Sequence, residues 1–100
     1  MSKLTKAAKG KDCTVRIPSY CNGNPETTVL AHVNGVRFGH GIGNKVNDLL
    51  AADTCSACHD ILDGRVRCDT FTHKELKLMF YEGVMETQLR RVEDGLVVLA

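Results

Sequence analysis

Two pairs of cysteines constrain the folding of this chain more than any other feature of its sequence. Cys55 and Cys58 are separated by two residues in the stretch CSACHD, and Cys13 and Cys21 are separated by seven. Structural zinc takes four ligands in a tetrahedron, and two such pairs supply four thiolates. We therefore predict that these four cysteines bind structural Zn²⁺ and that Cys68 lies outside the site.

The stretch CSACH also matches two other patterns. Cys-x-x-Cys-His attaches c-type haem, and Cys-x-x-Cys near a βαβ unit forms a redox dithiol. Haem attachment normally belongs to exported proteins and would leave Cys13 and Cys21 without a role, and the sequence has no βαβ pattern. Zinc accounts for more of the cysteines than either alternative.

The size of the chain also favours a metal. Its 100 residues correspond to one small domain, and it has no Trp, three Phe and two Tyr to fill a core. The N-terminal sequence MSKLTKAAKGKDC lacks the apolar stretch of a signal peptide, and no segment is long and apolar enough to span a membrane. We therefore expect a cytoplasmic protein whose cysteines bind metal or react as thiols. No motif calls for a small-molecule organic cofactor.

Local patterns predict an α+β domain. A β-branched, apolar stretch at 27–33 indicates a buried strand, and four glycines at 34–45 indicate a loop. Residues 48–54 are compatible with a strand or a helix, and 56–64 is typical of a short helix that ends at Gly64.

A long helix is predicted at 70–94. Thr72 and Glu75 have the spacing of a capping box, which satisfies backbone N–H groups at a helix start. One helical face then carries Leu76, Met79, Phe80, Gly83, Val84 and Thr87. Residues 96–100 resemble a final strand. We thus divide the single domain 1–100 into a basic N-terminal arm (1–12), a core (13–65) and a C-terminal amphipathic helix (70–94).

The net charge of +1 is small, but the basic residues are clustered. Lysines and one arginine outnumber a single Asp near the N-terminus, and Arg65 and Arg67 follow the cysteine–histidine motif. Such clusters are either solvated surface or contacts to nucleic-acid phosphates. Our candidates for phosphate contacts are Arg16, Arg37, Lys45 and Arg65.

His59 and Asp63 have helical spacing for a second metal site. Residues four apart share one face of a helix, so the imidazole and the carboxylate can meet. Such a pair, with open positions for water and phosphate oxygens, suits Mg²⁺ or Mn²⁺. The alternative is that His59 packs and Asp63 only precedes the turn at Gly64.

The order of these features resembles the HNH, or ββα-metal, nuclease motif, in which a strand ending in His precedes a glycine-rich loop, a second strand and a helix. More closely, CTVRIPSYCNGNPETTVLAH and CSACHDILDGR resemble the YbcO-like nucleases of lambdoid prophages. The resemblance covers most of residues 5–65, and the C-terminal third matches only loosely. It implies a zinc-stabilised ββα-metal domain that uses a divalent ion to hydrolyse phosphodiester bonds in DNA.

The resemblance also implies roles for individual residues. His32 would be the general base that activates water, for which a side chain that titrates near neutral pH is suited. His59 and Asp63 would hold the catalytic Mg²⁺ or Mn²⁺. The middle position of the motif falls on Asn47 or Asp48, and we favour Asp48, which would brace the loop.

One position departs from the motif. Many family members have an acidic metal ligand directly before the first His, and this chain has Ala31 there. A non-catalytic zinc-binding module that contacts nucleic acid or protein is therefore the alternative function. His40 and His73 match no motif position, and we expect both on the surface.

Overall fold

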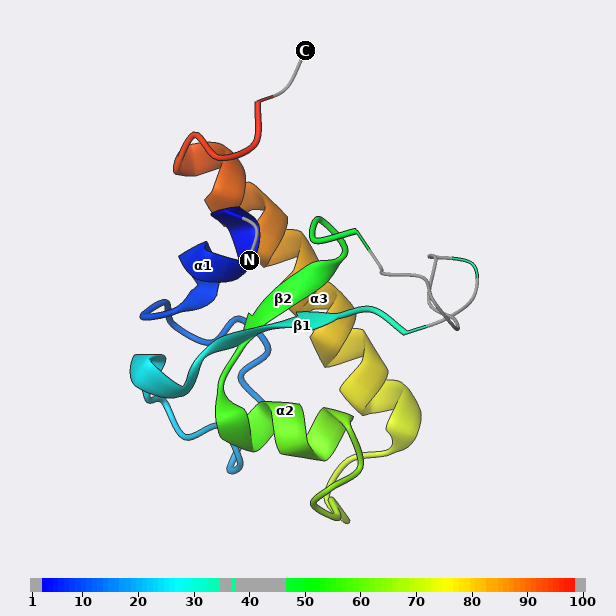
Figure 1. The fold of residues 1–100 in the computed structure, drawn as a ribbon. Helices are drawn as coiled ribbons and strands as arrows, with labels where there is room; N and C mark the ends of the chain where they lie inside the picture. Colours follow the sequence, from blue (N-terminus) through cyan, green and yellow to red (C-terminus); the bar gives the residue numbers. More distant parts are fainter. Residues whose placement is uncertain (1–2, 35–36, 38–46, 99–100) are drawn as a thin grey trace.

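A computed structural model of the chain describes residues 3–34, 37 and 47–98. The elements follow one another along the chain as α1, η1, β1, β2, α2 and α3 (Figure 1). Their bounds are α1 Lys3–Ala8, η1 Pro25–Thr27, β1 Val29–His32, β2 Ala51–Thr54, α2 Ser56–Leu62 and α3 His73–Glu93. The predicted α+β class is confirmed. Within the described part, a two-stranded sheet and three α-helices make up the fold.

The two strands pair in antiparallel fashion, with Val29 opposite Thr54 and His32 opposite Ala51. β2 is buried along its whole length, whereas Val29 at the start of β1 is 44% exposed. The predicted strand at 27–33 is confirmed for 29–32, but it is buried only in part, since Ala31 is buried and Val29 is exposed. β2 is the buried strand because α3 packs against it and crosses behind the sheet in Figure 1.

The capping box at the start of α3 is confirmed. The Thr72 hydroxyl accepts a hydrogen bond from the Glu75 backbone N–H, and the Glu75 carboxylate accepts one from the Thr72 N–H. The predicted face is turned inward, since Gly83, Val84 and Thr87 are buried. The opposite face is less polar than an amphipathic helix requires, because it exposes Leu78, Met85 and Leu89.

A polar network joins β2 to α3 and to the chain before the sheet. The Asp53 carboxylate pairs with Arg90 (Oδ2–Nη1 2.8 Å) and with Arg91. The Asp53 carbonyl accepts hydrogen bonds from both the N–H and the hydroxyl of Thr14. Thr87 completes the network by accepting from the Asp53 N–H. These bonds fix the strand that leads into the cysteine pair at 55 and 58.

Both ends of the described chain differ from what the sequence predicts. Residues 3–8 form a helix that packs near β1 with Ala8 fully buried, so this part of the predicted basic arm is anchored. The final strand expected at 96–100 is absent from 96–98, where the backbone folds back onto Arg91 after Gly95 (φ +76°). In the part of the chain that is described, every helix is too short or too polar to cross a membrane.

Candidate functional site

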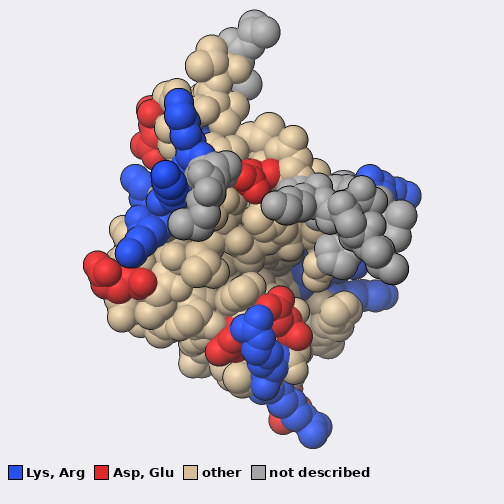
Figure 2. Space-filling view, viewed as in Figure 1, with Lys and Arg blue, Asp and Glu red and all other residues tan. Residues whose placement is uncertain are grey.

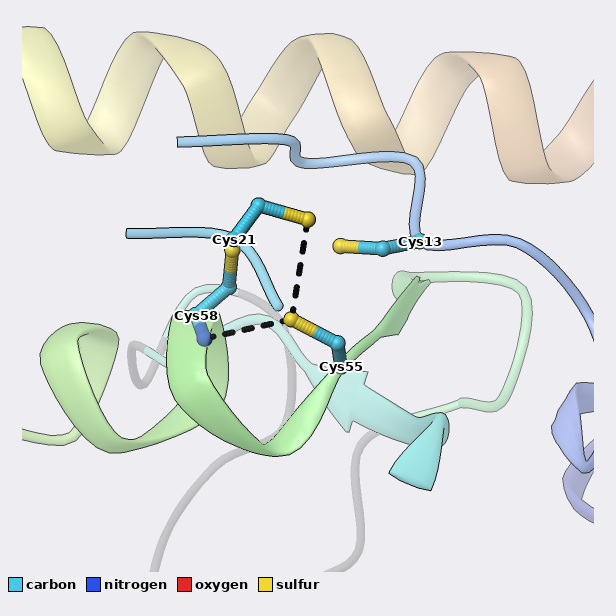
Figure 3. Close-up of side chains that lie close together, drawn as sticks. All are labelled: Cys13, Cys21, Cys55 and Cys58. Atoms are coloured by element: carbon cyan, nitrogen blue, oxygen red, sulfur yellow. Dashed lines mark hydrogen bonds between the residues drawn. The ribbon is translucent and has the colours of Figure 1, made fainter. Parts of the chain in front are cut away.

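Four cysteines from distant parts of the chain meet in one cluster. The sulfurs of Cys13, Cys21, Cys55 and Cys58 lie within 4.8 Å of one another and point toward a common centre (Figure 3). Cys21 Sγ and Cys55 Sγ are 3.7 Å apart. Zn–S bonds of about 2.3 Å in a tetrahedron place sulfurs about 3.8 Å apart, so the cluster can bind a metal such as zinc. Cys68 is half-buried and lies outside the cluster, as predicted.

Local backbone structure positions the two cysteine pairs. Cys55 follows β2 and is the N-cap of α2, where its sulfur accepts a hydrogen bond from the Cys58 N–H (3.4 Å). The loop between Cys13 and Cys21 turns twice through positive φ, at Arg16 (+49°) and Ser19 (+70°). This strained loop brings the first pair to the second.

Contacts within the cluster shift the pKa values of three of its thiols. A hydrogen bond from Cys58 lowers the pKa of Cys13, and the same bond together with burial raises the pKa of Cys58. Burial raises the pKa of Cys21. Cys13 therefore loses its proton more readily than Cys21 and Cys58 do, and a bound metal would displace the protons that those two thiols retain.

A pocket of about 190 Å³ lies between β1, α2 and α3. β1 contributes Ala31 and His32, and α2 contributes His59 and Asp63. The structure thus brings together the three residues that the sequence predicted for the base and the catalytic ion. Among the described residues, the four cysteines are the one group of three or more His, Cys, Asp or Glu side chains close enough together to hold a metal ion. The pocket therefore offers a close pair of such side chains, His59 and Asp63, on α2 and its C-cap, and not a group of three.

His32 is held by Asp48, which lies just before β2. His32 Nε2 is 2.6 Å from Asp48 Oδ1, and the Thr5 hydroxyl donates to the other carboxylate oxygen at 3.4 Å. A carboxylate can only accept, so the bond places the imidazole proton on Nε2 and leaves Nδ1 as the basic nitrogen. Asn47 instead braces the turn, because its side-chain oxygen accepts from the Leu49 N–H.

His59 and Asp63 meet on one face of α2. His59 Nε2 and Asp63 Oδ2 are 3.2 Å apart. Two adjacent ligands on an octahedral ion with bonds of about 2.1 Å lie about 3.0 Å apart, so the pair fits two positions on such an ion. The same Asp63 oxygen accepts a hydrogen bond from Arg65 Nη2 at 2.7 Å, and Arg65 also pairs with Asp60.

A match to a family of known proteins covers the residues just described. The family model "Putative nuclease YbcO" matches residues 2–96. This chain belongs to the YbcO family. It is 46% identical over 98 residues to "Putative nuclease YbcO" of Escherichia coli (strain K12), covering 97% of this chain and 98% of the relative. The "Putative nuclease ybcO" of Enterobacteria phage 82 matches with the same identity and coverage.

A solved structure has the same fold. This YbcO-family chain superposes on the "Structure of a putative bacteriophage protein from Escherichia coli str. K-12 substr. MG1655" with a TM-score of 0.76 and 41% identity. The likeness covers 92% of this chain and 99% of the other. The predicted resemblance to YbcO-like nucleases is therefore confirmed at the level of the family, including a relative from a phage.

The four basic residues predicted to contact phosphates occupy different settings in this YbcO-family protein. Arg16 forms two hydrogen bonds to Glu86 (2.8 and 2.6 Å), and Arg65 is engaged by Asp60 and Asp63. Arg37 is exposed, and Lys45 lies outside the described residues. On the face drawn in Figure 2, basic side chains form separate groups beside acidic ones.

Sequence reasoning missed the contribution of α3 to the pocket. His73, Lys77 and Tyr81 of α3 line it together with residues of β1 and α2. His73 is exposed, as expected, but it is not remote from the site. The spacing of four residues along one helix face is present in the sequence, yet only the crossing of α3 behind the sheet shows which way that face points. His40 lies outside the described residues.

Proposed function

We propose that this protein is a zinc-stabilised, metal-dependent endonuclease of the HNH type that hydrolyses phosphodiester bonds in DNA. Membership of a family described as nucleases supports hydrolysis of nucleic acid. The observation that carries the finer proposal is that His32, His59 and Asp63 line one pocket although they come from two different elements.

In this mechanism His32 is the general base. Asp48 accepts a hydrogen bond from the Nε2–H group and fixes the orientation of the ring, so Nδ1 receives the proton of the attacking water. Because Asp48 is a carboxylate, it also stabilises the imidazolium that forms when Nδ1 is protonated. Asp48 is thus a positioning residue for His32.

His59 and Asp63 would hold Mg²⁺ or Mn²⁺ through Nε2 and Oδ2. When bound, the ion supplies positive charge that stabilises the phosphate and the leaving oxygen. Arg65 keeps the Asp63 carboxylate turned toward His59 by a hydrogen bond to the same oxygen. Ion binding would require Arg65 to yield that oxygen or share it.

Structural zinc at the four cysteines would hold the pocket in shape. Cys58 and His59 are consecutive residues of α2, and Cys55 caps the same helix. Fixing the two sulfurs therefore fixes the start of the helix that carries the ligands of the second ion.

The second candidate is a zinc-binding module that contacts nucleic acid without cutting it. Two observations favour it. Ala31 offers no carboxylate to the pocket, and the Asp63 oxygen is already engaged by Arg65. In this case His32 and Asp48 would form only a structural hydrogen bond between β1 and the turn before β2.

Nicking of supercoiled plasmid separates the two candidates. Wild-type protein is incubated with added Mg²⁺ or Mn²⁺ and compared with His32→Ala and with a reaction that receives no divalent ion. The ion is omitted and not chelated, because a chelator would also remove metal from the cysteines. The nuclease predicts nicking that needs the added ion and is lost in His32→Ala. The binding module predicts no ion-dependent nicking by either protein. Circular dichroism and zinc content confirm that the variant is folded.

A further inference from the structure

The side of the pocket formed by α3 presents polar groups at a regular spacing. His73, Lys77 and Tyr81 follow one another at intervals of four residues and therefore share one face of the helix. Leu76 and Phe80 also line the pocket and pack against the core. The helix thus adds an imidazole, an ammonium group and a phenol to the pocket that His32 and His59 also line.

Lys77 stands out among these groups because of its charge. Among the described residues it has no hydrogen bond or ion pair, whereas Arg16 and Arg65 are both engaged by carboxylates. The one carboxylate among the residues that line the pocket belongs to Asp63, which already contacts His59 and Arg65. An ammonium group that has no carboxylate partner is available to attract an anion into the pocket.

We propose that Lys77 binds a backbone phosphate of DNA and that α3 forms the second wall of the substrate site. The inference rests on the proposed function in one respect, namely that the pocket receives nucleic acid. A lysine binds phosphate as a compact point charge and does not require a particular base. Lys77 therefore adds affinity that is independent of sequence and holds the strand at the pocket that His32 also lines.

Binding measurements under conditions that do not permit cleavage test this role. His32→Ala protein without added divalent ion is titrated into fluorescently labelled duplex and single-stranded oligonucleotides, and anisotropy is followed at several salt concentrations. Lys77→Ala is introduced into this background. Lys74→Ala serves as the matched control, because Lys74 is on the same helix and does not line the pocket. Lys77→Arg tests whether charge alone restores binding.

The expected result is that Lys77→Ala weakens binding about threefold to tenfold on every probe and reduces the salt dependence by roughly one phosphate contact. Lys74→Ala leaves both quantities unchanged, and Lys77→Arg restores most of the affinity. Equal losses in Lys77→Ala and Lys74→Ala would overturn the inference, because they would reflect general surface charge. Absence of binding to both probes would overturn it as well.

The two proposals can fail separately. If DNA binding depends on Lys77 but the protein never nicks plasmid, the phosphate contact is supported and the proposed hydrolysis is refuted. If wild-type protein nicks plasmid in an ion-dependent manner but Lys77→Ala binds DNA as well as before, the nuclease is supported and the contact by Lys77 is refuted.

Discussion

Asp53 of β2 and Arg91 of α3 form an ion pair that is almost completely removed from water. The Asp53 side chain is 0% exposed and that of Arg91 is 2% exposed. Arg90 pairs with the other carboxylate oxygen. One carboxylate therefore joins the buried strand to two successive positions of the long helix, close to the start of the cysteine cluster.

Replacing Asp53 by Asn should destabilise the protein strongly. The substitution leaves the buried Arg91 guanidinium without its counter-charge, which typically costs about 3–5 kcal/mol. Denaturation by urea, with zinc present, measures the loss. Asp94→Asn is the control, because Asp94 pairs with Lys11 at 3.6 Å on the surface, where such pairs contribute about 1 kcal/mol or less. Similar losses in the two variants would contradict the special role of the buried pair.

Gly83→Ala should also destabilise the fold, although alanine favours helices. An added Cβ would lie 3.0 Å from Thr14 Oγ1 and 3.0 Å from Val15 Cγ2. The Thr14 hydroxyl is held by Asp53 and Thr87 and cannot move without breaking those bonds. Overpacking costs about 1–3 kcal/mol, which exceeds the gain in helix propensity of roughly 1 kcal/mol. Thermal unfolding of Gly83→Ala is compared with that of Glu82→Ala, a substitution at an exposed position of the same helix. A melting temperature of Gly83→Ala at or above that of wild type would refute the prediction.

Loss of one cysteine of the cluster should remove bound zinc and unfold the region around it. Purified wild-type protein is expected to contain one zinc per chain, and Cys55→Ser to contain far less. Structural zinc contributes on the order of 10 kcal/mol of apparent binding energy, so the variant should lose cooperative unfolding. Cys68→Ser should retain both zinc and fold, since Cys68 lies outside the cluster. Stoichiometric zinc in Cys55→Ser would exclude the proposed ligand set.

Zinc affinity should fall as the pH falls. The pKa of Cys58 is raised by its hydrogen bond to Cys13 and by burial, and the pKa of Cys21 is raised by burial. Both thiols therefore carry protons at neutral pH in the metal-free protein and must release them on binding. Each released proton weakens binding by about tenfold per unit decrease in pH. Competition with a zinc chelator at pH 6, 7 and 8 measures the slope, and a pH-independent affinity would show that the ligands are already thiolates.

Asp48→Asn should lower the rate of plasmid nicking more than it lowers DNA binding. The amide no longer fixes the proton on His32 Nε2, so Nδ1 is the basic nitrogen in only part of the molecules. We expect the rate to decrease between about tenfold and a thousandfold, within the usual contribution of a positioned base. Asn47→Ala is a useful comparison because Asn47 braces the turn through Leu49, whereas the hydrogen bond to His32 Nε2 comes from Asp48. Equal effects of the two substitutions would indicate a role in loop structure alone.

The sequence was most informative where chemistry requires a fixed spacing. Cys-x-x-Cys at a helix start, the capping box of α3 and the pair at i and i+4 on α2 each depend on contacts within a few residues. Such contacts follow from local geometry and could be predicted directly. The meeting of Cys13 and Cys21 with the second pair was inferred from the ligand number that zinc needs.

Contacts that depend on how elements cross were not predictable from the chain alone. The burial of β2 and the exposure of Val29 follow from which strand α3 covers. The approach of Lys77 to the pocket has the same origin. The sequence suggests a phosphate contact for Arg65 and does not show its pairing with Asp60 and Asp63, which depends on the turn that follows α2.

Half of the cysteine cluster and both proposed ligands of the second ion lie on or beside one short helix, and this limits how the chain can change in length. Cys55, Cys58, His59 and Asp63 all fall within the nine residues from 55 to 63. Each residue inserted into a helix rotates everything after it by about 100°. A single insertion between Cys58 and His59 would leave the sulfurs in place and turn the imidazole and the carboxylate away from the pocket. Variation in length among related chains is therefore expected in the surrounding loops and not within this helix.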